Sequence, residues 1–234
     1  GPKYLSNWEK FAKPSWLNYC KEHDLGLVVF DKAYNSNDDP FMKKANWQKL
    51  LIGKQIQSSS LEVLNICYLD IDILISPLAP NIFENYDSKK FRLVSQINNL
   101  PNDRIYNLRR LAFLRHTHLD SRYELDSSLF MSPEAIFRFH TLPEHKDYAC
   151  TGLFVFNVVN HADLLYSWFI KYDSKIQTIT GGGDEPHLNH EFQSTNLVDW
   201  LPYKFQALWI YEVAIYYPFL FKKLDDKCLI RECI

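Results

Sequence analysis

The chain has 234 residues, of which 47% are hydrophobic and 23% are charged, as expected for one soluble domain with a sizeable core. Its net charge of −2 lacks the basic excess of nucleic-acid-binding proteins, so we expect no nucleic-acid partner. The five cysteines show no metal-site spacing, and no apolar run is long enough to span a bilayer. We therefore expect a single domain over residues 1–234 with no transmembrane segment.

A cytoplasmic location is expected, because the chain has no signal peptide and no N-x-[ST] sequon. The Golgi lumen is the alternative, and it would require an N-terminal anchor ahead of residue 1.

Hydrophobic residues recur at helical spacing in some segments and form short continuous runs in others, and the two kinds of segment alternate. Such alternation predicts an α/β sandwich with a mainly parallel central sheet flanked by helices. In chain order the expected elements are a helix over 3–23, a strand over 25–30, a helix over 45–57, strands over 63–75 and 91–97, helices over 105–118 and 128–138, a strand over 153–159, helices over 161–172 and 185–192, and a strand over 201–205. Within 128–138, the Ser-Pro-Glu of residues 132–134 predicts a capped helix start at Pro133.

The strand expected over 63–75 is the most informative, because Asp70 and Asp72 interrupt its apolar run. Residues i and i+2 lie on one face of a strand, so both carboxylates are expected to point the same way at or near its end. Carboxylates in an apolar setting must be solvated, paired or bound to a cation. Because Mn²⁺ and Mg²⁺ take oxygen ligands from carboxylates, substrate phosphates and water, the pair predicts such a site. The alternative is that the aspartates only cap the next turn.

Five segments, in their order along the chain, resemble those of GT-A fold glycosyltransferases. YLDIDILI followed by SPLAPNIFE is similar to the D-x-D strand of these enzymes, and TGLFVFN (151–157) is similar to the strand after it. An opening helix and second strand are resembled by NWEKFAKPSWLNYCKEHDLGLVVFD. The helix before the D-x-D strand is resembled by NWQKLLIGKQI. The loop and helix near the acceptor are resembled by GGGDEPHLNHEF (181–192). The resemblance covers most of residues 8–205 and implies a GT-A (Rossmann-like) fold.

The resemblance also implies a function. The chain would be a metal-dependent glycosyltransferase that moves a hexose or pentose from a nucleoside diphosphate, with a UDP-sugar favoured, to a hydroxyl of a glycan. Asp72 would bind Mn²⁺ or Mg²⁺ directly, and Asp70 would contact the ribose or reach the ion through water. Lys49 and Gly152 are the further implied contacts of the donor.

Asp184 and Glu185 follow three glycines and open a predicted helix. Acidic groups are favoured at a helix N-terminus, so a structural cap explains one of them. The functional interpretation is a general base that deprotonates the acceptor hydroxyl in an inverting transfer, with Asp184 placed ahead of Glu185.

A basic stretch accompanies the helix expected over 105–118, where charged residues usually form a solvated face. The alternative is that one of its arginines clamps the diphosphate. His187 and His190 share a helix face by their spacing and predict surface or acceptor-side chemistry. The basic residues are Arg104, Arg109, Arg110, Arg115, His116 and His118.

Two other functions compete with glycosyl transfer. A non-catalytic carbohydrate-binding protein on the same fold is one, because fold alone does not imply activity. The other is a D-x-D phosphatase, whose motif requires Thr or Val where this chain has Leu74.

Overall fold

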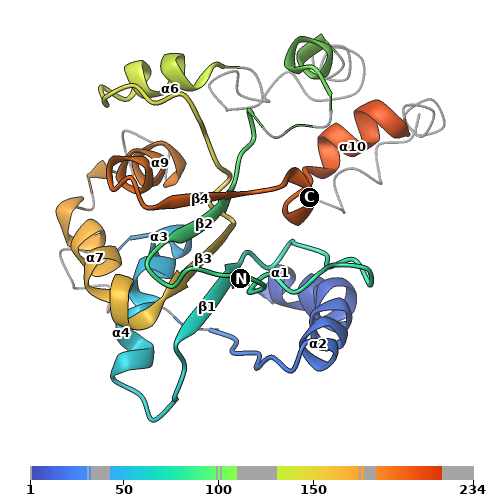
Figure 1. Cartoon of the computed structure of the whole chain (residues 1–234), viewed down its shortest axis with the longest axis vertical. Helices are drawn as coiled ribbons and strands as arrows, with labels where there is room; N and C mark the ends of the chain where they lie inside the picture. The colour runs from blue at the N-terminus through green and yellow to red at the C-terminus, as the bar shows by residue number, and fades with distance from the viewer. Residues whose placement is uncertain are drawn as a thin grey trace. The chain divides into compact units, whose positions relative to one another are not determined.

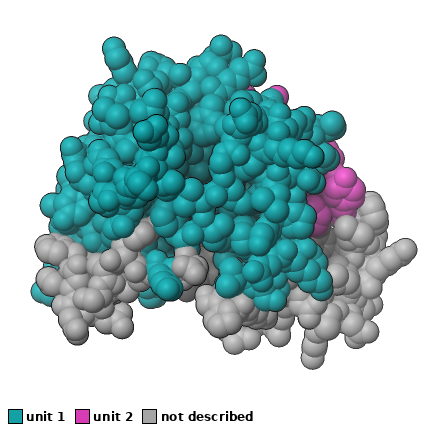
Figure 2. Space-filling model, turned by 90° about the horizontal axis from the view of Figure 1, so that it is seen from below, with its two compact units in different colours: residues 1–93, 150–200 teal, residues 94–149, 201–234 magenta. Residues whose placement is uncertain are grey.

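The computed structural model is a mixed α/β structure, as expected. It describes residues 2–30, 32, 43–98, 100, 102–109, 131–173, 175–176 and 183–217. The chain divides into two compact units, Gly1–Leu93 with Cys150–Trp200 and Val94–Ala149 with Leu201–Ile234, which Figure 2 colours separately. The single domain expected over residues 1–234 stays a prediction.

The described residues form a four-stranded sheet with the strand order β1-β3-β2-β4 (Figure 1). Both β1 and β2 run antiparallel to β3. The expectation of a mainly parallel sheet is therefore wrong around β3, because hydrophobic runs identify strands but not their direction, which the connections decide. The strands are β1 (Asn65–Leu69), β2 (Phe91–Val94), β3 (Leu153–Asn157) and β4 (Val198–Leu201).

The antiparallel register of β1 and β3 places the D-x-D pair. Leu69 at the end of β1 is opposite Leu153 at the start of β3, so Asp70 lies beside Gly152. The Asp70 amide donates a hydrogen bond of 2.7 Å to the Gly152 carbonyl. Residues 71–72 form a turn in which the Ile73 amide donates to the Asp70 carbonyl. The strand expected over 63–75 is thus shorter, and the aspartates follow its end.

One helical segment ahead of β1 packs against the helix after β3, α7 (Val158–Lys171), as Figure 1 shows. Gly53 lies at this contact, where a Cβ would come within 2.7 Å of the Ala162 Cβ. At the start of α7, the Asn157 side chain accepts a hydrogen bond from the Asn160 amide, which satisfies one free helix donor. The segment confirms the helix expected over 45–57 and consists of α3 (Ala45–Gln48), the 3₁₀ turn η2 (Lys49–Leu51) and α4 (Ile52–Gln57).

The N-terminal residues are helical throughout, as expected over 3–23. Pro14 is accommodated because the turn before it is a π-helix, which loosens the ladder where a proline N–H is missing. The strand expected over 25–30 does not form, although Val28 and Phe30 belong to an apolar run; both are exposed. An apolar run becomes a strand only where a neighbouring strand offers hydrogen bonds. The elements are α1 (Pro2–Asn7), η1 (Trp8–Ala12) and α2 (Lys13–Glu22).

The helix α9 (Glu185–Ser194) confirms the helix expected over 185–192. Its Phe192 is buried and packs against the rings of Phe91, Phe154 and Trp168. Helix α9 is thereby fixed against the sheet and the helix α7. The first residue of α9 consequently has a defined place in the first unit.

The second unit contains α6 (Pro133–Phe139), which begins where the sequence predicts, since the Ser132 hydroxyl accepts from the Ala135 amide. The strand expected over 201–205 is wrong: the strand β4 ends at Leu201, and a 3₁₀ turn, η3 (Tyr203–Phe205), and a helix, α10 (Trp209–Tyr216), follow. Residues 104–109 are helical. The rest of the helix expected over 105–118 lies outside the described residues, with Arg110, Arg115, His116 and His118.

In the part of the chain that the structure describes, every helix is too short or too polar to cross a membrane.

Candidate functional site

Charged and polar side chains gather in the first unit, where β1 ends, β3 begins and α9 starts. They come from segments far apart in the sequence, which the strand register and the packing of α9 bring together. We call this group the carboxylate cluster. Its members are Lys49, Tyr68, Asp70, Asp72, Cys150, Thr151, Gly152, Asp184 and Glu185.

The carboxylate cluster contains a buried ion pair between Lys49 and Asp184. Lys49 Nζ lies 2.6 Å from Asp184 Oδ2, and the two side chains are 1% and 7% exposed. The Lys49 ammonium also donates to the carbonyl and the hydroxyl oxygen of Thr151, over 2.8 and 2.9 Å. Burial lowers the pKa of Lys49, but the carboxylates of Asp184 and Asp70 outweigh it and raise the pKa above its ordinary value. Lys49 is therefore held charged.

Both oxygens of the Asp184 carboxylate are engaged. Oδ2 accepts from Thr151 Oγ1 at 2.8 Å as well as from Lys49, and Oδ1 accepts from Asn46 Nδ2 at 3.0 Å. Its side chain makes no capping bond to α9, so the cap interpretation does not describe it. The Asp184 carboxylate therefore accepts three hydrogen bonds from other parts of the first unit. We infer that Asp184 anchors the start of α9.

Glu185 differs from Asp184 in exposure, and its own pKa is raised. It is half-buried, whereas Asp184 is buried. Desolvation, followed by the negative charge of Asp184, raises the pKa of Glu185 to about 7, although a hydrogen bond from the Cys150 thiol opposes the shift. A carboxyl group with a pKa near neutrality exchanges protons readily at physiological pH, which suits a general acid or base.

Asp70 is half-buried, and its Oδ1 accepts a hydrogen bond of 2.5 Å from the Tyr68 hydroxyl. Burial raises the pKa of Asp70, while Lys49 and the Tyr68 hydrogen bond lower it and the carboxylates of Asp184 and Asp72 raise it further. Asp72 is exposed in the turn. The expectation that Asp70 and Asp72 point the same way stays a prediction, and strand alternation does not support it, because β1 ends at Leu69.

The carboxylate cluster contains more carboxylates than ammonium groups. Four carboxylates (Asp70, Asp72, Asp184 and Glu185) are countered by the ammonium of Lys49, and their mutual repulsion contributes to the raised pKa values. Within the described residues, no group of three or more His, Cys, Asp or Glu side chains could hold a metal ion. The expectation that Asp70 and Asp72 bind Mn²⁺ or Mg²⁺ stays a prediction, in which substrate oxygens and water supply the other ligands.

The two histidines of α9, His187 and His190, are not members of the carboxylate cluster. His187 is buried, and its ring lies 4.9 Å from that of Tyr172 and 6.4 Å from that of Trp47. His190 is half-buried, with Nδ1 3.4 Å from the hydroxyl oxygen of Ser194. In the second unit, Arg104 donates to the Met131 carbonyl, which is a structural contact and not evidence of a diphosphate clamp.

Sequence reasoning missed Tyr68, Cys150 and Thr151 of the carboxylate cluster, and also Asn46, which bonds to Asp184. Tyr68 precedes Asp70 by two positions, a spacing that would place both on one face if the strand expected over 63–75 reached Asp70. Asn46 precedes Lys49 by three positions, which places them on one face of a helix. Thr151 stands beside Gly152 but carries no comparable signal, because its role depends on Asp184, 33 positions later.

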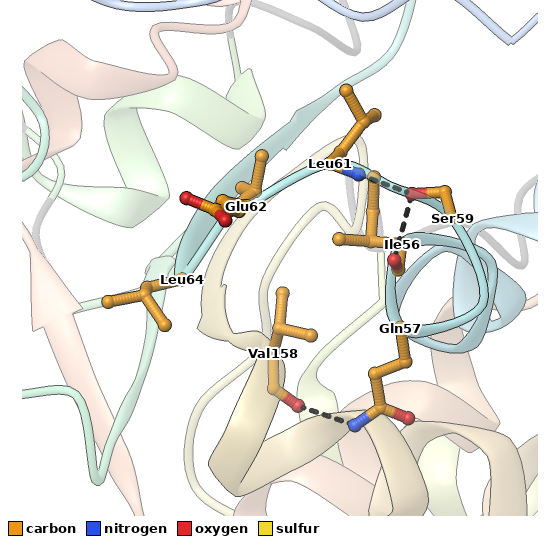
Figure 3. A pocket seen from close by; sticks show the side chains of 8 residues that line it. Ile56, Gln57, Ser59, Leu61, Glu62, Leu64 and Val158 are labelled. Atoms are coloured by element: carbon orange, nitrogen blue, oxygen red, sulfur yellow. Dashed lines mark hydrogen bonds between the residues drawn. The ribbon is translucent and has the colours of Figure 1, made fainter.

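A groove of about 490 Å³ elsewhere in the first unit is not part of this site (Figure 3). Its lining is mostly apolar and contains no member of the carboxylate cluster. Its polar groups bond locally: Gln57 Nε2 donates to the Val158 carbonyl and Ser59 Oγ donates to the Ile56 carbonyl (Figure 3). The chemistry-bearing residues lie in the carboxylate cluster and not in the groove.

Comparisons of this chain with protein-family models, with curated proteins and with solved structures find no match.

Proposed function

We propose that this protein is a metal-dependent glycosyltransferase that moves a sugar from a nucleoside diphosphate, with a UDP-sugar favoured, to a hydroxyl of a glycan. The observation that carries the proposal is the carboxylate cluster. Asp70 is distant in the sequence from the neighbouring residues Asp184 and Glu185, yet the three interact electrostatically around Lys49. The segments that supply them are those that resemble GT-A enzymes, in the same order.

Asp70 and Asp72 are the residues that would hold Mn²⁺ or Mg²⁺. When bound, the ion neutralises the charge that develops on the leaving nucleoside diphosphate. The excess of carboxylates over ammonium groups in the cluster supports this assignment. A phosphate-rich ligand without a cation would meet repulsion from the same carboxylates.

Glu185 is the residue that would take the proton of the acceptor hydroxyl onto a carboxylate oxygen in an inverting transfer. Its pKa of about 7 supports this role, since the group is partly ionised at neutral pH and also binds a proton readily. Asp184, placed ahead of Glu185 on sequence grounds, would keep the start of α9 in place through Lys49 and Asn46. Lys49 would act through Asp184 and not by contacting the donor.

A thermal-shift panel tests the donor site. UDP, GDP, CMP and dTDP are each added with and without Mn²⁺ to the wild type and to Asp72→Ala. A ligand that binds only the folded state raises the unfolding temperature in proportion to RT ln(1 + [L]/Kd). We expect UDP to raise the unfolding temperature only when Mn²⁺ is present, and we expect this rise to be lost in Asp72→Ala. The Asp72 side chain is exposed, so the variant should fold normally. No rise with any nucleotide would contradict the proposal.

A further inference from the structure

Gly152 lies directly against the carboxylate of Asp70. A Cβ built on Gly152 would stand 2.8 Å from Asp70 Oδ2, 3.3 Å from its Cγ and 3.5 Å from its Cβ. A separation below 3.0 Å is one that real Cβ atoms essentially never show. The backbone of Gly152 is not left-handed, so glycine is not needed there for its conformation. What the position requires is room for the Asp70 side chain.

Asp70 is constrained by its neighbours in three ways. Its amide donates to the Gly152 carbonyl over 2.7 Å, which fixes the backbone. Its Oδ1 accepts from the Tyr68 hydroxyl over 2.5 Å, which fixes the rotation of the carboxylate. Its Oδ2 then lies over the bare Cα of Gly152. The Tyr68 hydroxyl bonds to Oδ1, so Gly152 and not Tyr68 limits the place of Oδ2.

We propose that Gly152 is a positioning residue that sets the place of Asp70 Oδ2 for a divalent cation, with the Tyr68 hydroxyl as its partner in holding the carboxylate. The proposal rests on the proposed function, because it concerns the same ion. It assigns to Gly152 a role other than contact with the donor. A methyl group at position 152 displaces Oδ2, and residues that orient a metal ligand typically change metal affinity by about 10- to 100-fold.

The substitution should not damage the fold, because the three nearest atoms all belong to the short side chain of Asp70. Two other glycines provide the contrast. At Gly53 a Cβ would meet the Cα of Ala162 at 2.9 Å, and this backbone atom of α7 cannot move without separating two helices. At Gly26 a Cβ would meet nothing within 4 Å. Gly26→Ala is therefore the matched control.

The test is a titration with Mn²⁺, in which the electron paramagnetic resonance signal of the free ion reports binding, with and without UDP. Wild type, Gly26→Ala, Gly152→Ala and Tyr68→Phe are compared, and thermal unfolding without Mn²⁺ is recorded for each. We expect Gly26→Ala to bind as the wild type does. Gly152→Ala should bind Mn²⁺ about tenfold or more weakly. Its unfolding temperature should stay within about 4 °C of the wild type. Tyr68→Phe should also weaken Mn²⁺ binding, because one of the constraints on Asp70 is lost.

Each other outcome overturns a defined part of the account. Gly152→Ala with wild-type Mn²⁺ affinity overturns the positioning role and leaves the proposed function standing. If Gly152→Ala is unfolded without Mn²⁺, the positioning role is also overturned, because the added methyl group would then disturb more of the structure than the Asp70 side chain. A wild type that binds no Mn²⁺ with or without UDP overturns the positioning role and the proposed function together.

Discussion

Lys49 Nζ and Asp184 Oδ2 form a 2.6 Å ion pair whose side chains are almost wholly removed from solvent. The pair joins the 3₁₀ turn η2, ahead of β1, to the residue that directly precedes α9. Lys49 also donates hydrogen bonds to Thr151, and Asp184 also accepts hydrogen bonds from Thr151 and Asn46. Both buried charges thus have hydrogen-bond partners in addition to each other. The pair thus ties the two ends of the candidate site together.

Replacing Lys49 with methionine should destabilise the protein by about 3–5 kcal/mol, because Asp184 is then left buried without its counter-charge. Urea denaturation of the variant measures this loss. The double variant Lys49→Met/Asp184→Leu should recover most of it, since no lone charge remains buried.

Lys54 and Asp163 provide the control, because they also form an ion pair but their side chains are 38% and 81% exposed. Lys54→Met should change the free energy of unfolding by about 1 kcal/mol or less. Equal losses for Lys49→Met and Lys54→Met would show that the buried pair has no special role.

Much of the fold follows from local signals in the sequence. The capped start of α6 at Ser132 and the helical segment over residues 45–57 were predictable, because caps and helical periodicity act over a few residues. The position of Asp70 near a strand end was predictable for the same reason. Local patterns fail where the outcome depends on partners: the antiparallel direction of β3 and the missing strand over 25–30 are both decided by distant neighbours.

The candidate site shows the same limit. The sequence indicated Asp70, Asp184 and Glu185 by motif, but it ranked Asp184 above Glu185 as the base. Our proposal reverses this ranking, because Lys49 and Asn46, which lies 138 positions before Asp184, engage the Asp184 carboxylate. Local sequence patterns cannot predict a contact between residues that far apart. The contacts of Asp184 could therefore be seen only in the folded chain.

The stability of the protein should depend on the protonation of Glu185. Its pKa rises from 4.5 to about 7 on folding, so the folded state binds the proton more tightly than the unfolded state. The stability that this proton contributes is fully present below pH 4.5 and is lost as the pH rises through about 7. A shift of this size corresponds to roughly 3 kcal/mol.

The variant Glu185→Gln removes this titration. It should be more stable than the wild type at pH 8, with a smaller difference at pH 4.5, when both are unfolded with urea at the two pH values. A difference that does not change with pH would mean that Glu185 is not held protonated in the fold.

His161 should make the first unit sensitive to acid. It is buried, its Nδ1 accepts a hydrogen bond from the Asn157 amide, and its Nε2 lies 3.2 Å from the Lys89 carbonyl. Desolvation lowers its pKa from 6.5, despite the opposing effect of Lys89. The unfolded state therefore binds a proton first, and stability falls as the pH drops through 6.5 toward the lower folded pKa.

The variant His161→Gln keeps one acceptor and one donor but does not titrate. The free energy of unfolding measured by urea between pH 5 and 7 should fall less steeply for His161→Gln than for the wild type. The same slope in both proteins would show that His161 is not the acid-sensitive group.

The most direct test of the account is the release of UDP from a panel of UDP-sugars in the presence of Mn²⁺, measured for the wild type, Glu185→Gln and Gly26→Ala. The account predicts release by the wild type and by Gly26→Ala, and a rate about 10²- to 10⁴-fold lower for Glu185→Gln, as expected when a general base is lost. Release of UDP by Glu185→Gln at the wild-type rate, or by none of the proteins from any donor, would contradict it.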